Sequence, residues 1–280
     1  MRKFRARLRL NKKYLVYIPN YNSGLDLVDI IFSIPEEIQF LSNILVLDNQ
    51  SNDESIHELI KKLINEYKYN NIVIIQPEKN LGYAGSQKLA YTIATNQNEI
   101  EKVIMLHSDG QYPAECLKLF IPFFSKNNDI VYGRRDKIEF PDVEETPLFT
   151  YYVIKLISYL ASIISGKKFD EWVSGFRMYD INFLRKIDYN SLSKKPVFDC
   201  EMLILSSLNN DNTKSFPIYK KYVGKIASFT GVSGIKLVLD IINTSFKART
   251  DKYKSIAGKK NNFKHNYKII FNNIFIEEKS

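Results

Sequence analysis

Short apolar runs alternate with longer stretches of helical spacing through the first half of the chain. The apolar runs predict strands at 14–18, 44–47, 72–75, 103–106 and 130–132. Apolar residues spaced three and four apart predict helices at 25–32, 54–67, 83–95 and 115–124. Strands that are apolar throughout and alternate with helices are typical of parallel sheets covered on both faces. We therefore expect an α/β fold with a doubly wound, mostly parallel sheet and flanking helices.

The pattern changes after residue 133. An acidic segment with two prolines at 140–147 precedes a long apolar helix expected at 147–164, followed by helices at 181–187, 200–208 and 234–246 and a strand at 213–219. The apolar run at 151–164 is shorter than the roughly 20 residues of a bilayer-spanning helix, so no membrane anchor is expected. These later helices form the expected C-terminal helical extension. From about residue 250 the chain is polar and rich in Lys and Asn, so we expect a polar tail there.

Composition excludes several classes of protein. With 280 residues, of which 45% are hydrophobic and 25% charged, the chain is expected to be globular rather than disordered. Its two cysteines, Cys116 and Cys200, are far apart and lack metal-ligand spacing, so neither a disulfide framework nor a zinc site is expected. No signal peptide is expected either, because charged residues interrupt the N-terminal leucines. A reduced, cytoplasmic location fits these features.

The net charge of +9 is concentrated at the two ends of the chain, within 2–13 and 247–268. Such ends could contact an anionic membrane surface, or they could be solvated tails, and the sequence leaves both interpretations open. Basic residues interleaved with aromatics on a core surface would indicate nucleic-acid binding. That pattern is not found, so nucleic acid is not expected as a partner.

The segment after the fourth predicted strand is the strongest candidate for chemistry. In His107-Ser108-Asp109-Gly110-Gln111, Asp109 can offer a carboxylate and Gln111 a carbonyl oxygen at the carboxyl end of a buried strand. These hard ligands suit Mg²⁺ or Mn²⁺ that bridges substrate phosphates. Alternatively, Asp109 caps the helix that follows.

Three further polar loops end strands at the same edge of the predicted sheet. Asp48 could accept a hydrogen bond from a nucleobase, and Gly82 and Gly85 would let the backbone approach a ligand closely. Lys88, one helical turn further on, could reach a phosphate. The alternative is that Asp48 and Asp53 cap helices and the glycines only shape a turn. Together the loops suggest a nucleotide site.

A series of motifs in order resembles family 2 glycosyltransferases with the GT-A fold. The series consists of Asp48 in the strand-two loop, Asn80-Leu81-Gly82-Tyr83-Ala84-Gly85, His107-Ser108-Asp109, Gly133-Arg134-Arg135, Ser174-Gly175-Phe176-Arg177, Phe198-Asp199-Cys200-Glu201 and Phe216-Pro217-Ile218. The resemblance covers about residues 14–245 and is greatest to the polyprenyl-phosphate branch, the relatives of dolichyl-phosphate mannose and glucose synthases. An ordered series is more specific than any single motif.

The resemblance implies roles for individual residues. The donor would be a UDP- or GDP-linked sugar, bound by Pro19, Tyr21, Asn22, Asp48, Asn80, Gly82, Gly85, Lys88 and Ser108. The metal, Mn²⁺ or Mg²⁺, would be held by Asp109, Gln111 and His107, and Asp109 would count among the catalytic residues. Arg135 and Arg177, both counted as catalytic, would meet phosphate of either the acceptor or the donor, and Glu171 and Ser174 would lie beside them at the acceptor. If the acceptor is a hydroxyl, a general base is needed, and Asp199 or Glu201 would supply it.

Three positions depart from the family pattern. His107 replaces the first Asp of the DxD motif, Asn49 replaces the second Asp of the strand-two loop, and Ser23 stands where an acidic residue is common. If His107 is a metal ligand, its neutral imidazole favours manganese. Otherwise it hydrogen-bonds a sugar or ribose and touches no metal.

The expected function is inverting, metal-dependent transfer of a hexose to a polyprenyl phosphate or a membrane-linked glycan. Transfer to a sugar hydroxyl in cell-surface polysaccharide synthesis is an alternative, and a non-catalytic sugar-nucleotide-binding protein is another. The helix at 147–164 could rest on a membrane surface, which would make the protein peripheral on the cytoplasmic face, or it could be buried in the core or in a homo-oligomer interface.

These expectations divide the chain into a basic N-terminal segment (1–13), a glycosyltransferase domain (14–248) and a basic polar tail (249–280). Within the domain, residues 14–135 form the nucleotide-binding half and 136–248 the acceptor half.

Overall fold

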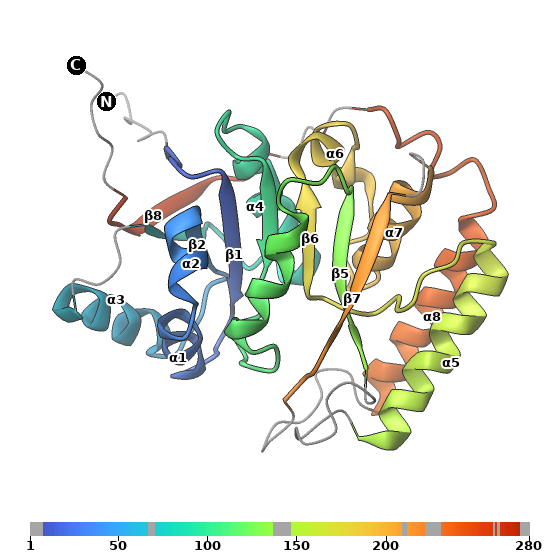
Figure 1. Cartoon of the computed structure of the whole chain (residues 1–280), viewed down its shortest axis with the longest axis horizontal. Helices are drawn as coiled ribbons and strands as arrows, with labels where there is room; N and C mark the ends of the chain where they lie inside the picture. The colour runs from blue at the N-terminus through green and yellow to red at the C-terminus, as the bar shows by residue number, and fades with distance from the viewer. Residues whose placement is uncertain are drawn as a thin grey trace.

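In the computed structural model, residues 8–66, 71–136, 147–208, 212–221, 231–259, 261 and 264–274 are described. They form one eight-stranded sheet in the order β7-β5-β6-β4-β1-β2-β3-β8 (Figure 1). The strands are β1 (Tyr14–Asn20), β2 (Ser42–Asp48), β3 (Ile72–Pro77), β4 (Lys102–Met105), β5 (Ile130–Arg135), β6 (Arg177–Asp180), β7 (Thr213–Ile218) and β8 (Tyr267–Asn272). All the strands predicted from the apolar runs are confirmed.

Most strands of the sheet run in one direction. β1 is parallel to both β2 and β4, β2 is parallel to β3, and β5 is parallel to β7. Only β6 and β8, among the described strands, run the other way, because β6 is antiparallel to β4 and β5 and β8 is antiparallel to β3. The carboxyl ends of the parallel strands and the start of β6 therefore meet at one edge of the sheet, here called the rim.

Helices cover both faces of the sheet. α1 (Asp26–Phe32), α2 (Glu36–Leu41), α3 (Ser55–Glu66) and the 3₁₀ helix η1 (Ala114–Phe123) lie on one face. α4 (Gly82–Thr95), α5 (Leu148–Ser165), α6 (Ile181–Arg185), α7 (Phe198–Leu208) and α8 (Gly231–Lys247) lie on the other, with a short 3₁₀ turn, η2 (Tyr189–Ser191), between α6 and α7. This arrangement confirms the doubly wound α/β fold.

Alternate residues of each central strand enter opposite cores. Val16 and Ile18 of β1 pack in the core under α1, whereas Leu15 and Tyr17 pack in the core under α4. All four side chains are buried, which is why the strand is apolar at every position rather than at every second one.

Some predicted elements were wrong. The segment 115–124 is a 3₁₀ helix rather than an α-helix, and it contains Pro122, whose ring nitrogen cannot donate an α-helical hydrogen bond. β6 was not predicted. The tail expected from residue 249 is not wholly irregular, because Tyr267–Asn272 forms β8 at the edge of the sheet.

Helix α5 has the expected length and is displaced by one residue from the predicted range of 147–164. It spans 18 residues and, by length and composition alone, is long and apolar enough to cross a membrane. The acidic segment before it lies mostly outside the described residues, since the description resumes at Pro147.

Candidate functional site

Loops from three strands are joined at the rim by amide and hydroxyl side chains. The Nδ2 atom of Asn20, at the end of β1, lies 3.1 Å from Asp48 Oδ1, from Ser51 Oγ and from Ser55 Oγ. Asn22 and Gln50 have positive φ angles of 54° and 66°, so both loops turn sharply here. The Asn22 side chain accepts a hydrogen bond from Asn52 N at 2.8 Å. The two loops therefore form one rigid unit.

Asp48, the residue expected to meet the nucleobase, is buried at the centre of this unit. Its Oδ2 accepts a hydrogen bond of 2.6 Å from Gln76 Nε2 of β3, and its Oδ1 accepts from Asn20 and, at 3.3 Å, from the backbone N–H of Ser51. It is 2% exposed. The carboxylate therefore already ties β1, β2 and β3 together, and a base would have to share its lone pairs with these donors.

Asn49 links the loop after β2 to the loop after β3. Its Nδ2 donates to Asn80 Oδ1 at 2.9 Å and its Oδ1 accepts from Leu81 N at 2.8 Å. Asn80 Oδ1 also accepts from the backbone N–H of Gly82, which begins α4 with a φ of 69°. An aspartate at position 49 could not donate to Asn80, so the departure from the family pattern has a structural consequence.

The other predicted nucleotide-binding residues line the same loops. Pro19 is half-buried at the end of β1, and Tyr21 beyond it is 53% exposed. Gly85 lies in the first turn of α4, where an added Cβ would come within 2.7 Å of Leu81 Cβ. Close packing of α4 on its own N-terminal loop therefore requires glycine at this position.

The segment after β4 brings its polar groups to the rim beside the β1 loop. Ser108 Oγ lies 2.6 Å from Ser23 Oγ, so the residue that replaces a common acidic one contacts the metal-binding segment directly. Asp109 Oδ1 accepts a hydrogen bond from Gln111 N at 3.0 Å across Gly110, whose φ is 68°. The Asp109 side chain is half-buried at the rim, whereas the residue Gln111 is buried.

His107 points toward the start of β6. An added Cβ at Gly175 would lie 2.5 Å from His107 Nε2, and the imidazole lies 5.1 Å from the ring of Tyr112 and 6.3 Å from that of Tyr83. Among the described residues, Nε2 has no hydrogen-bond partner. Burial lowers the pKa of His107, although the nearby Asp109 carboxylate partly opposes the shift. The imidazole is therefore neutral at neutral pH, and its Nε2 faces backbone.

Asp199 lies in the first turn of α7 and is bound to residues of α4. Its Oδ2 accepts a hydrogen bond of 2.7 Å from Tyr83 Oη, and its Oδ1 accepts one of 3.3 Å from Gln87 Nε2. The residue is 5% exposed. Burial, followed by the charge of Asp199, raises the pKa of Tyr83 well above its usual range, so this hydroxyl keeps its proton.

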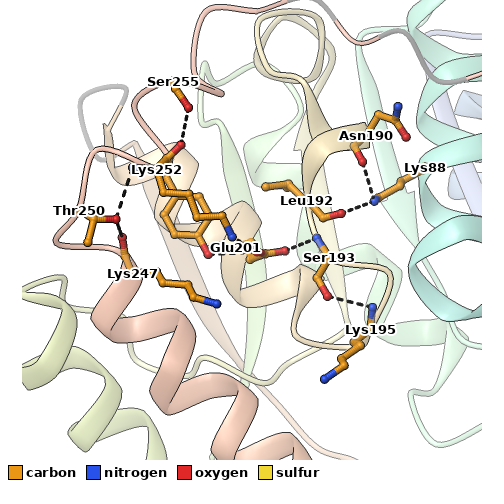
Figure 2. Close-up of polar contacts among 11 residues, drawn as sticks. Lys88, Asn190, Leu192, Ser193, Lys195, Glu201, Lys247, Thr250, Lys252 and Ser255 are labelled. Atoms are coloured by element: carbon orange, nitrogen blue, oxygen red, sulfur yellow. Dashed lines mark hydrogen bonds and ion pairs between the residues drawn. The ribbon is translucent and has the colours of Figure 1, made fainter.

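Glu201 and Lys88 both hold a loop between α6 and α7 (Figure 2). Glu201 Oε2 accepts from Ser193 N at 2.6 Å, and its Oε1 accepts from Tyr253 Oη at 3.0 Å. Lys88 Nζ donates to the carbonyls of Leu192 at 2.7 Å and Asn190 at 3.2 Å. Lys88 is 1% exposed and its ammonium is directed away from the rim. It is therefore not placed to bind a phosphate at the rim, as the sequence had suggested.

The two arginines expected at the acceptor occupy different surroundings. Arg135, at the end of β5, forms an ion pair of 2.8 Å with the fully buried Glu171, which also accepts from the backbone N–H of Arg135. Arg177 is fully buried, and its guanidinium donates to the carbonyls of Ser174 at 2.6 Å, Asp199 at 2.5 Å and Trp172 at 3.1 Å. This geometry makes Arg177 a clamp on the backbone beside the rim.

Several residues at the site were missed from the sequence. Tyr83 and Gln76 hold the two carboxylates of Asp199 and Asp48, and Lys220, after β7, places its ammonium 4.9 Å from the centre of the Tyr112 ring. The backbone N–H of Lys221 donates to Gln111 O at 2.8 Å, which joins the end of β7 to the metal-binding segment. The pair of lysines immediately after a strand was the available signal for a cationic rim.

Few acidic groups gather at this rim. Within the described ranges, no three His, Cys, Asp or Glu side chains come together as a metal cluster. Asp109 is half-exposed and can offer a carboxylate oxygen, which fits a metal ion whose other ligands are supplied by a bound diphosphate. His107 places its Nε2 against Gly175, and the role of metal ligand considered for it stays a prediction.

The chain is similar in fold to solved glycosyltransferases. Glucosyl-3-phosphoglycerate synthase from Mycobacterium tuberculosis, solved with Mn²⁺, UDP and phosphoglyceric acid, matches with a TM-score of 0.61 and 13% identity over 85% of this chain and 78% of that one. S. aureus TarS 1-349 in complex with UDP matches with a TM-score of 0.50 and 19% identity over 84% and 65% of the two chains.

A third similar structure is the mannosyltransferase PcManGT from Pyrobaculum calidifontis, solved with GDP-Man and Mn²⁺, with a TM-score of 0.51 and 13% identity over 75% of this chain and 55% of that one. At these identities the likeness shows the fold. The family model for glycosyl transferase family 2 matches residues 15–188, which is more than half of the chain. The protein is therefore a glycosyltransferase of family 2 with the GT-A fold.

Proposed function

We propose that this enzyme transfers a hexose from a UDP- or GDP-sugar to a polyprenyl phosphate, with inversion at the anomeric carbon and with Mn²⁺ or Mg²⁺ as cofactor. The reaction would take place at the cytoplasmic face of a membrane. A nucleoside diphosphate and Mn²⁺ accompany one of the similar structures, and a GDP-sugar and Mn²⁺ accompany another, which supports the donor class and the metal.

The surroundings of the two candidate bases support a phosphate acceptor. A sugar hydroxyl must lose a proton as it attacks, so an accessible carboxylate has to face it. Asp199 and Glu201 are 5% and 3% exposed, and each already accepts two hydrogen bonds from protein groups. A phosphate monoester oxygen is ionised near neutral pH and needs no such base.

Positive charge at the acceptor side of the rim also favours an anionic acceptor. Arg134 is partly exposed at the end of β5, and Lys220 lies beside Tyr112 at the end of β7. Arg135 is held by Glu171 in one orientation. Charged donors of this kind bind phosphate oxygens by charge-assisted hydrogen bonds and fix the nucleophile in line with the anomeric carbon.

Asp109 would hold the cofactor against the diphosphate of the donor. When bound, the cation neutralises the charge that develops on the leaving nucleoside diphosphate. The loops joined by Asn20 and Asn49 would hold the nucleoside without rearrangement. Such preorganisation keeps the anomeric carbon within reach of the acceptor phosphate.

The proposal is tested by assaying transfer from radiolabelled UDP- and GDP-sugars to a polyprenyl phosphate, with the matching polyprenol as the control acceptor. We expect product with the phosphate and none with the alcohol. We also expect Asp199→Asn to retain activity within about tenfold, because a missing general base typically costs 10²- to 10⁴-fold.

Transfer to the polyprenol or to a glycan hydroxyl, abolished by Asp199→Asn, would contradict the proposal and support a hydroxyl acceptor. Retention of transfer by Glu201→Gln, measured on folded protein, would exclude the second carboxylate as the base.

A further inference from the structure

The outer face of helix α5 is entirely apolar and aromatic. Every residue of the helix that is exposed belongs to these types, namely Leu148, Phe149, Tyr152, Leu156, Tyr159, Leu160 and Ile163, with exposed fractions between 40% and 81%. They recur every three or four residues, so they share one side of the helix. Soluble proteins rarely expose a continuous apolar stripe of this length, and such stripes mark interaction surfaces.

The opposite side of α5 is packed on the protein. Ile157, Ser158, Ala161 and Ser165 are buried, and Trp172 donates from its backbone N–H to Ser158 Oγ and from Nε1 to Ser162 Oγ. The helix lies alongside α8 at one side of the molecule (Figure 1). Because one side is fixed to the domain by these contacts, only the outer stripe can meet a partner, and the helix cannot cross a bilayer in this fold.

Positive charge surrounds the carboxyl end of the stripe. Arg249, after α8, donates to the carbonyls of Ile163 and Ile164 and so caps α5. Lys167 and Lys168 follow the C-cap residue Gly166, and α5 itself contains no acidic residue. Exposed aliphatic and tyrosine side chains beside Lys and Arg form the pattern that binds anionic lipid headgroups.

The stripe begins beside the candidate site. β5 ends at the rim with Arg135, and α5 starts only thirteen residues later at Leu148. In Figure 1 both α5 and α8 begin at the end of the molecule where β5 and β7 end. A bilayer on the stripe would therefore lie next to the rim.

We propose that the α5 stripe docks the enzyme on an anionic bilayer, with α5 lying in the headgroup region and Lys167, Lys168 and Arg249 on the lipid phosphates. This inference rests on the proposed function, because a polyprenyl acceptor can be reached only at a membrane surface. A second copy of the chain is the other apolar partner to consider, but its α5 carries no acidic residue that could pair with Lys167, Lys168 or Arg249. The charges favour the lipid.

Co-sedimentation with vesicles tests the surface without any donor or acceptor, so failure of the proposed chemistry does not affect the readout. The full chain is mixed with phosphatidylcholine vesicles that contain 0% or about 30% phosphatidylglycerol. We expect binding to the anionic vesicles. Leu156→Gln combined with Tyr159→Gln should weaken it at least about tenfold, since burial of each side chain contributes about 1.5–3 kcal/mol.

The control Ile64→Gln removes an apolar side chain of similar exposure (51%) from α3, on the other face of the sheet, and should bind like the wild type. Lys167→Gln with Lys168→Gln should reduce binding to anionic vesicles about 5-fold per lysine, the equivalent of about 1 kcal/mol each. Unchanged binding of the Leu156/Tyr159 variant would overturn the proposal and leave the basic termini as the contact. A lipid-free dimer that the same variant converts to a monomer would also overturn it.

Discussion

The two sides of the rim are held together by different chemistry. On the side of β1, β2 and β3, the amides of Asn20, Asn49 and Gln76 join the loops, and Asn20 and Gln76 do so by donating to the one buried carboxylate of Asp48. On the side of β5 and β6, buried charges do so, through the Arg135–Glu171 ion pair and the Arg177 clamp. Neutral bridges can exchange hydrogen bonds with a ligand at little cost, whereas breaking a buried charge pair costs several kcal/mol. The donor side is therefore suited to ligand binding, and the acceptor side depends on its charges for stability.

The largest expected effect is on the acceptor side. Arg177→Met leaves three buried carbonyls without their charged donor and should lower the free energy of unfolding by about 3–5 kcal/mol. The control Arg134→Met removes a partly exposed guanidinium and should cost less than about 1 kcal/mol. Urea unfolding followed by circular dichroism gives both values, and equal losses would remove the contrast between buried and exposed charge.

At the rim itself, Asp109→Asn should reduce kcat by about 10²-fold or more, because the amide gives up the negative charge that would hold a cation. An asparagine at this position can still accept from Gln111 N, so we expect stability to change by less than about 0.5 kcal/mol. Steady-state kinetics with UDP- and GDP-sugars measure the effect, with Asp251→Asn, an exposed site, as the control. Full activity in Asp109→Asn would exclude the proposed cofactor site.

Lys88 should make stability depend on pH. Burial lowers its pKa from 10.5 to about 8, so between these values the unfolded chain binds more protons than the folded one. The free energy of unfolding should therefore rise with pH across this window, by on the order of 3 kcal/mol for this group. Lys88→Met should lose that rise while keeping the contributions of other groups. Parallel slopes for both proteins from pH 8 to 10.5 would show that Lys88 titrates normally.

The smallest effect is expected on the donor side. Asn49→Asp keeps the acceptor for Leu81 N but places a carboxylate oxygen against Asn80 Oδ1, and should cost about 1–2 kcal/mol. Asn52→Asp, on the same loop but exposed, is the matched control. Thermal unfolding compares the two. A destabilisation as large as that of Arg177→Met would mean that the two sides of the rim do not differ.

The donor side of the fold could be predicted from the sequence because its signals are local. Each of β1 to β4 is an apolar run, and each polar loop directly follows its strand. β6 was missed because Arg177-Met178-Tyr179-Asp180 is short and has a charge at each end. β8 was missed because its residues lie within a Lys- and Asn-rich stretch.

The fate of individual charged residues could not be predicted in the same way. Lys88 donates to carbonyls 102 and 104 residues further along the chain, and Glu201 accepts from Tyr253, 52 residues away. Nothing in the sequence around Lys88 or Glu201 specifies these partners. From their positions on helices near the rim, Lys88 was therefore predicted to bind a phosphate and Glu201 to act as a general base. The assignment of Asp109, in contrast, depends only on the strand that precedes it.

The pairing of β8 with β3 affects the order in which the protein can fold during synthesis. β3 has its outer hydrogen-bonding groups open until residues 267–272 have been made, because no other described strand covers that side. An open strand edge on an apolar sheet is a site for aggregation. Translation must therefore proceed almost 200 residues beyond β3 before this edge is closed, so a nascent chain halted before residue 267 should need a chaperone to remain monomeric.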